Sequence, residues 1–162
     1  MSLFDDDQYR WRETYFVLFD PERRPLLSEV EARLKGLNAR FELSGGRVDD
    51  AGRIESLTLL SPHDSAALDI TYLSGEEVMQ ETSELLKELQ PIDDEEQRRL
   101  ARARKLTGRF DVMHFEYVQA DVADEEEEGD VSFDPSALLI VLDALTEMTD
   151  GVAFDPQSGC MM

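Results

Sequence analysis

The sequence contains two histidines, and each has a carboxylate close to it. His114 and Glu116 are two positions apart in the segment 108–118, which predicts a strand, so we expect their side chains on one face. Such a pair could act as a general base with an orienting carboxylate, or as two metal ligands. His63 precedes Asp64 in an expected turn, where polar residues are common without any chemistry. Because no further ligand cluster accompanies either histidine, a hydrogen-bonded His114 near the core is the favoured interpretation.

The common catalytic and phosphate-binding patterns do not occur in the sequence. It has neither the G-x-S-x-G pattern of a nucleophilic serine nor the phosphate-cradling G-x-x-x-x-G-K-[ST]. Cys160 is the only cysteine, so an internal disulfide and a cysteine metal cluster are both excluded. We therefore assign no catalytic residue, no metal site and no cofactor, and the sequence favours a protein that is not an enzyme.

The most acidic stretch, DEEEEGD at 124–130, partly matches the calcium-loop pattern. Carboxylates occupy its first, third and fifth positions, but its twelfth position, which must supply a bidentate carboxylate, is Pro135. The sequence therefore predicts a solvated acidic loop within 119–133, whose charges could still bind a partner together. The acidic residues assigned to this surface are Asp124, Glu125, Glu126, Glu127, Glu128 and Asp130.

A basic segment comes before the acidic one. Residues 98–109 hold six of the 16 basic residues, and Arg98 and Arg102 are expected near one face of a helix. These arginines could contact an acidic partner or a ligand. The favoured alternative is that they pair with acidic residues of the same chain or of a second copy.

The charge of the whole chain limits its partners. A formal net charge of −21 argues against nucleic acid and anionic membrane surfaces, both of which require a basic face. The charge is uneven, because residues 110–162 contain 14 of the 37 acidic residues and no Lys or Arg. A high-salt cytoplasm or a composition bias is the alternative explanation, but either should acidify the whole surface.

Apolar periodicity predicts an α+β protein. Strands are expected at 12–20, 39–43, 53–61, 66–74, 108–118 and 152–155, and helices at 26–37, 75–89, 93–106 and 135–148. The strands from 39 to 74 suggest an antiparallel meander, and the strand at 12–20 is apolar on both faces, as in the interior of a sheet. We expect an open, mostly antiparallel sheet of about five to six strands, with helices packed mainly on one face.

The chain has the length of one domain, 1–162, in which 1–11 and 156–162 are expected to be loosely ordered tails. It has no apolar stretch long enough for a membrane span and no pattern of a signal peptide, so a cytoplasmic location is expected.

Three hypotheses about function follow from these patterns. The leading one is a non-enzymatic module that presents its acidic C-terminal third to a basic protein partner. The second is an enzyme or small-ligand-binding protein of unfamiliar type, with a pocket over the sheet that involves His114 or His63. The third is a structural protein that self-associates, with the basic helix of one copy on the acidic loop of another.

Overall fold

The computed structural model describes residues 8–62, 65–117 and 136–161. The predictions for His63 and for the acidic residues at 124–130 fall outside these ranges. The strands are β1 (Tyr9–Phe19), β2 (Glu42–Val48), β3 (Ile54–Ser61), β4 (Ala66–Leu73), β5 (Gly108–Tyr117), β6 (Val152–Asp155) and β7 (Cys160–Met161). The helices are η2 (Pro21–Arg23, a 3-10 turn), α1 (Leu27–Leu37), α2 (Glu76–Lys87), α3 (Asp94–Ala103) and α4 (Ser136–Thr149).

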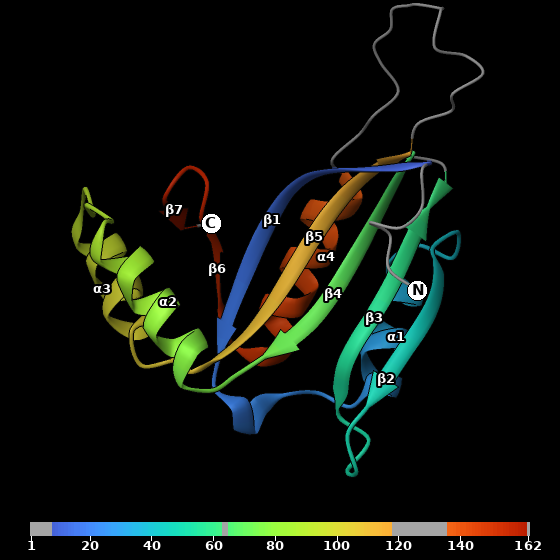
Figure 1. Ribbon diagram of the computed structural model, residues 1–162, viewed down its shortest axis with the longest axis horizontal. Coiled ribbons are helices and arrows are strands. Elements are labelled where there is room, and N and C mark those ends of the chain that lie inside the picture. The colour runs from blue at the N-terminus through green and yellow to red at the C-terminus, as the bar shows by residue number, and fades with distance from the viewer. Residues whose placement is uncertain (1–7, 63–64, 118–135, 162) are drawn as a thin grey trace, which may run out of the picture.

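The strands form one antiparallel sheet with the order β2-β3-β4-β5-β1-β6-β7, shown in Figure 1. The predicted meander is confirmed, because β2, β3 and β4 are neighbours in chain order. The predicted interior strand is also confirmed, since β1 lies between β5 and β6. The long pairing of β1 with β5 brings the first and fifth strands of the chain together at the centre of the sheet.

Helices cover the two faces of the sheet unequally. Val17 and Phe19 of β1 join the larger core, to which α1 and α4 contribute their apolar faces. The alternate residues Phe16 and Leu18 point to the opposite face and pack with α2, α3 and β6. In Figure 1, α1 and α4 lie behind the sheet, and α2 and α3 lie at its β6 end. The expected α+β class is confirmed. Among the described helices, none has the length and apolar character needed to cross a membrane.

Some residues of both expected tails belong to strands. β1 begins at Tyr9, inside the stretch 1–11 that was expected to be a loose tail, because its pairing with β5 continues to Tyr9 and Tyr117. The segment 156–162, also expected to be loose, contains β7, which pairs with the last residues of β6.

The second strand also differs from its prediction at 39–43. β2 runs through the SGGR stretch that was expected to be part of the connection to β3. Its register against β3 shifts between Ser44 and Arg47, and Gly45 has φ +64°. Glycine adopts this left-handed conformation without a Cβ penalty, so the strand bulges there instead of ending.

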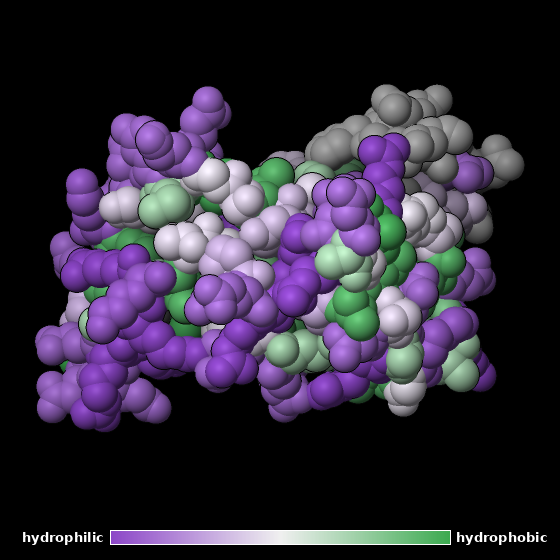
Figure 2. Space-filling view, turned by 90° about the horizontal axis from the view of Figure 1, so that it is seen from below, coloured by the Kyte–Doolittle hydropathy of each residue, from purple (hydrophilic) through white to green (hydrophobic). Residues whose placement is uncertain are grey.

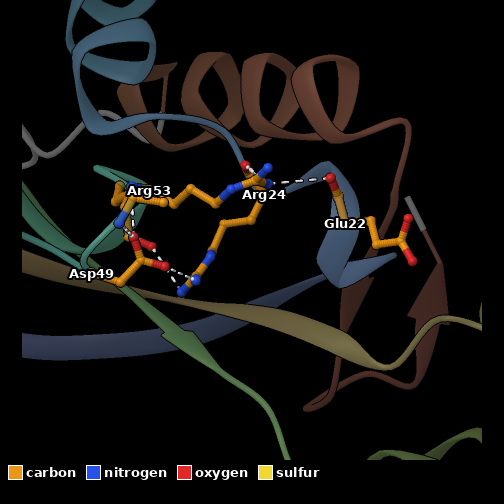
Figure 3. Close-up of polar contacts among 6 residues, drawn as sticks. Glu22, Arg24, Asp49 and Arg53 are labelled. Carbon is orange, nitrogen blue, oxygen red and sulfur yellow. Dashed lines mark hydrogen bonds and ion pairs between the residues drawn. The ribbon is translucent and has the colours of Figure 1, made fainter.

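Two arginines join the connection before α1 to the β2–β3 hairpin, as Figure 3 shows. Arg24 pairs with Asp49, and its guanidinium lies 4.1 Å from the centroid of the Tyr72 ring. Arg53 donates to the backbone oxygens of Glu22, at 3.2 Å, and of Arg24, at 2.8 Å. These contacts link segments about thirty residues apart in the chain, so we assign this cluster to holding the fold together.

Candidate functional site

His114 lies inside the protein, on the face of the sheet that α4 covers. Its side chain has no exposed surface, and its Nδ1 lies 3.4 Å from Oε2 of Glu13 on β1. Burial, together with the positive charge of Arg12, lowers the pKa of His114 from 6.5 to about 4. The imidazole is therefore neutral at physiological pH, and a ligand at the surface would meet Glu13 and not His114.

Glu116 does not orient His114 as the sequence suggested it could. It lies two residues further along β5, and its Oε1 accepts from Arg10 at 3.0 Å and from Arg12 at 3.2 Å. The carboxylate that approaches the imidazole comes instead from β1, at Glu13. Sequence spacing could not reveal this pairing, because it depends on the register between two distant strands.

A bulge in β1 explains why two arginines reach one carboxylate. Trp11 pairs with Phe115 and Glu13 pairs with His114, so Arg12 is an extra residue in β1. The extra residue interrupts the alternation of side chains and allows Arg12 to share Glu116 with Arg10. Bulges commonly re-aim side chains in this way, and they are frequent next to functional sites.

Beside this bulge is a hollow of about 430 Å³ at the surface. The residues around it are Arg10, Trp11, Arg12, Glu13, Tyr15, Asp155 and Gln157. Burial is the main cause that raises the pKa of Glu13 and of Tyr15. The negative charge of Asp155 raises the pKa of both groups further, and Glu13 raises that of Tyr15. The Glu13 side of the hollow therefore favours a cation, and the hollow offers a binding site without a histidine.

The basic helix α3 is partly neutralised within the chain. Arg102 pairs with Asp150 at 3.1 Å, which joins α3 to the residue just after α4, and it also donates to the backbone oxygen of Asp150. Arg98 is exposed. Figure 2 shows hydrophilic residues gathered over the end of the molecule that α2 and α3 form. The Arg102 contact supports the interpretation that part of this basic cluster pairs internally.

Helix α4 is largely buried but presents one exposed stripe. Leu139 is 50% exposed and Ile140 is 39% exposed, which is unusual beside so many buried neighbours on the same helix. Asp143 and Glu147 follow at helical spacing and are exposed as well. Glu147 also pairs with Arg33 of α1. The stripe combines two partly exposed apolar side chains with two carboxylates, one of which already pairs with Arg33.

One buried charge was missed by sequence reasoning altogether. Arg109 is 4% exposed and lies over the ring of Phe16, 4.0 Å from its centroid. It pairs with Asp111 at 2.6 Å and with Glu81 of α2 at 2.7 Å. Because these contacts tie α2 to the sheet, we assign Arg109 a structural role.

Comparisons with known proteins do not indicate a function for this chain. No protein-family model matches the chain, and no curated protein or solved structure is similar to it at a significant level. Function is therefore argued from the surfaces of this molecule alone.

Proposed function

We propose that the protein is a non-enzymatic cytoplasmic module that binds a basic protein partner through its acidic C-terminal third. The observation that carries the proposal is the exposed stripe of α4, formed by Leu139, Ile140, Asp143 and Glu147. In the sequence this helix follows the acidic residues at 124–130, and residues 110–162 contain no Lys or Arg.

The stripe offers both apolar and charged contacts to a partner. It runs from Leu139 to Glu147 along the helix, or about 12 Å at the rise of an α-helix. Leu139 and Ile140 would supply apolar contact, and burying the part of each side chain that is still exposed would contribute up to about 1.5 kcal/mol. Asp143 would pair with Lys or Arg of the partner, and Glu147 would have to exchange its contact with Arg33 for one with the partner. Such complementary charges speed encounter and select basic proteins.

The geometry of His114 favours binding over catalysis. A general base must come within hydrogen-bonding reach of the proton that it removes. His114 has no exposed surface, and its neutral imidazole faces Glu13 inside the protein. The burial of His114 therefore supports the hypothesis of a non-enzymatic module over that of an enzyme that uses His114.

Capture from a native lysate tests the proposal. The tagged protein should recover a basic partner at low salt and release it at high salt, because surface charges are screened within about 10 Å at 0.1 M. Neutralising all six acidic residues at 124–130 should abolish capture, and Leu139→Ser with Ile140→Ser should weaken it at least tenfold.

A charge-matched control separates the stripe from the general acidity of the chain. Asp143→Asn with Glu147→Gln removes two negative charges from α4. Glu84→Gln with Glu88→Gln removes two exposed charges, one from α2 and one from the residue that directly follows it. Only the α4 pair should reduce capture. Equal loss from both pairs would show that the partner responds to net charge, and capture that none of these changes affects would refute the proposal.

A further inference from the structure

The edge of β1 that faces away from β5 is only partly covered by its neighbour. β5 pairs with β1 along its whole length, from Tyr9 to Phe19. On the other edge, β6 pairs with β1 only at Phe16–Leu18. Beyond that point no strand in the described part of the chain continues the sheet along residues 10–15. Figure 1 shows this half of β1 extending past the end of β6.

The hollow of about 430 Å³ lies along this edge. Trp11 is opposite Phe115 and Tyr15 is opposite Val112, and these two β5 residues belong to clusters on different faces of the sheet. Trp11 and Tyr15 therefore point to opposite faces, yet both line the same hollow. A hollow bounded by both faces of a strand must lie at the strand's edge.

The side chain of Gln157 makes a hydrogen bond to the backbone of β1 at this edge. With its amide oriented to satisfy both neighbours, the nitrogen of Gln157 donates to the backbone oxygen of Thr14 at 3.0 Å and to Asp155 at 3.0 Å. The Thr14 carbonyl thus accepts from this side of β1, as it would from the N–H of an added strand. Gln157 is exposed, so an incoming backbone could displace it.

The charges around the hollow select a cation. Glu13 and Asp155 line the hollow together with the ring of Tyr15 and the exposed indole of Trp11. Glu116 accepts from both Arg10 and Arg12 and offsets one of their two positive charges. With Glu13 and Asp155 counted as well, these five groups keep one net negative charge. Carboxylates and aromatic faces are the groups that bind Lys and Arg side chains.

We propose that the edge of β1 at residues 10–15 binds an extended basic segment of a protein partner. The segment adds to the sheet as a strand and places a Lys or Arg side chain in the hollow, between Glu13 and Asp155. The proposal rests on the proposed function for the basic character of the partner, but it uses different residues from the α4 stripe.

Strand addition would give such a contact both affinity and selectivity. Main-chain hydrogen bonds to the edge provide affinity, and the side-chain pocket provides specificity. The bulge at Arg12 and the charges of Arg10 and Glu13 discourage pairing with arbitrary strands. A partner must therefore bring matching charge, which a basic segment does.

Selection of random octapeptides on the full-length protein tests the proposal and does not require an identified partner. Enriched peptides should contain Lys or Arg within an extended, β-forming sequence. With a synthetic peptide of the enriched sequence, amide hydrogen exchange should slow at residues 10–15. Glu13→Gln with Asp155→Asn should weaken its binding at least tenfold, whereas the matched pair Glu84→Gln with Glu88→Gln should leave it unchanged.

The proposal is overturned by peptides without basic enrichment, by binding that Glu13→Gln with Asp155→Asn does not change, or by protection that appears elsewhere. Changes to the α4 stripe should not affect peptide binding. If no peptide binds at the edge of β1 but α4-dependent capture of a basic protein persists, the proposal for the edge is wrong and the proposed function stands. If peptide binding persists and α4-dependent capture fails, the α4 assignment is wrong.

Discussion

Acidification should destabilise this protein through His114, and the size of the effect follows from the structure. The pKa of the buried imidazole is lowered from 6.5 to about 4. Between these values the unfolded chain binds a proton that the folded protein does not, so the free energy of unfolding falls as pH falls. At 1.36 kcal/mol for each pKa unit, the loss from this residue between pH 7.5 and pH 5 is about 2 kcal/mol.

Urea denaturation of the wild type and of His114→Gln at pH 7.5, 6 and 5 measures this contribution. The glutamine is neutral throughout, so the wild type should lose about 2 kcal/mol more than the variant over this range. The difference between the two proteins isolates His114, because Glu13, Asp69 and Asp111 remain in both. Burial raises the pKa of each of these carboxyls, so their contribution has the opposite sign and is lost as pH rises through the folded values.

A second variant tests whether a general loss of stability could by itself change the dependence on pH. Val112→Ala removes core volume at the neighbouring position on the same face of β5 but leaves His114 in place. It should be less stable than the wild type at every pH and should keep the same dependence on pH. If His114→Gln also kept the wild-type dependence on pH, the imidazole would not be buried in its neutral form.

Three further predictions concern single contacts and glycines. Arg109→Ala should cost about 2–4 kcal/mol in urea denaturation, because it leaves the partly buried Asp111 without its guanidinium, and removing Asp111 as well should recover part of the loss. Gly151→Ala should cost at least about 2 kcal/mol, since a Cβ there would lie 2.8 Å from Oγ1 of Thr149 and closer still to the backbone oxygen of Leu18. Gly36→Ala should instead stabilise the protein by up to about 1 kcal/mol in the same assay, because it lies within α1 and a Cβ there meets nothing within 4 Å. Equal costs for the two glycine changes would contradict the packing described around Gly151.

Much of the fold could be predicted from periodicity alone. The apolar residues on both faces of β1 predicted an interior strand, and the turns between residues 39 and 74 predicted the meander. Helix α4 was expected from 135 to 148 and lies at Ser136–Thr149, because most of its residues are apolar and Asp143 and Glu147 fall on one side of it. Such features are local in sequence, so a single sequence contains them.

The candidate sites depended on information that the sequence does not display. His114 and Glu116 lie on the same strand, but they do not contact each other as a pair. The strand register places Glu13 beside the imidazole, and the bulge at Arg12 lets Glu116 pair with two arginines. Arg109 looked like one more member of a basic segment, yet it is buried against Phe16. Long-range pairing and burial decide these roles, and charge patterns along the chain could not separate them.

Site-specific photo-crosslinking in native lysate would show whether the α4 stripe contacts a basic partner. A benzophenone amino acid in place of Ile140 should give a crosslink to a basic protein that disappears at high salt. The same group in place of Ile92, which is 84% exposed between α2 and α3, provides the matched control and should give none. No crosslink from position 140, or equal crosslinks from both positions, would show that the α4 stripe is not the contact surface.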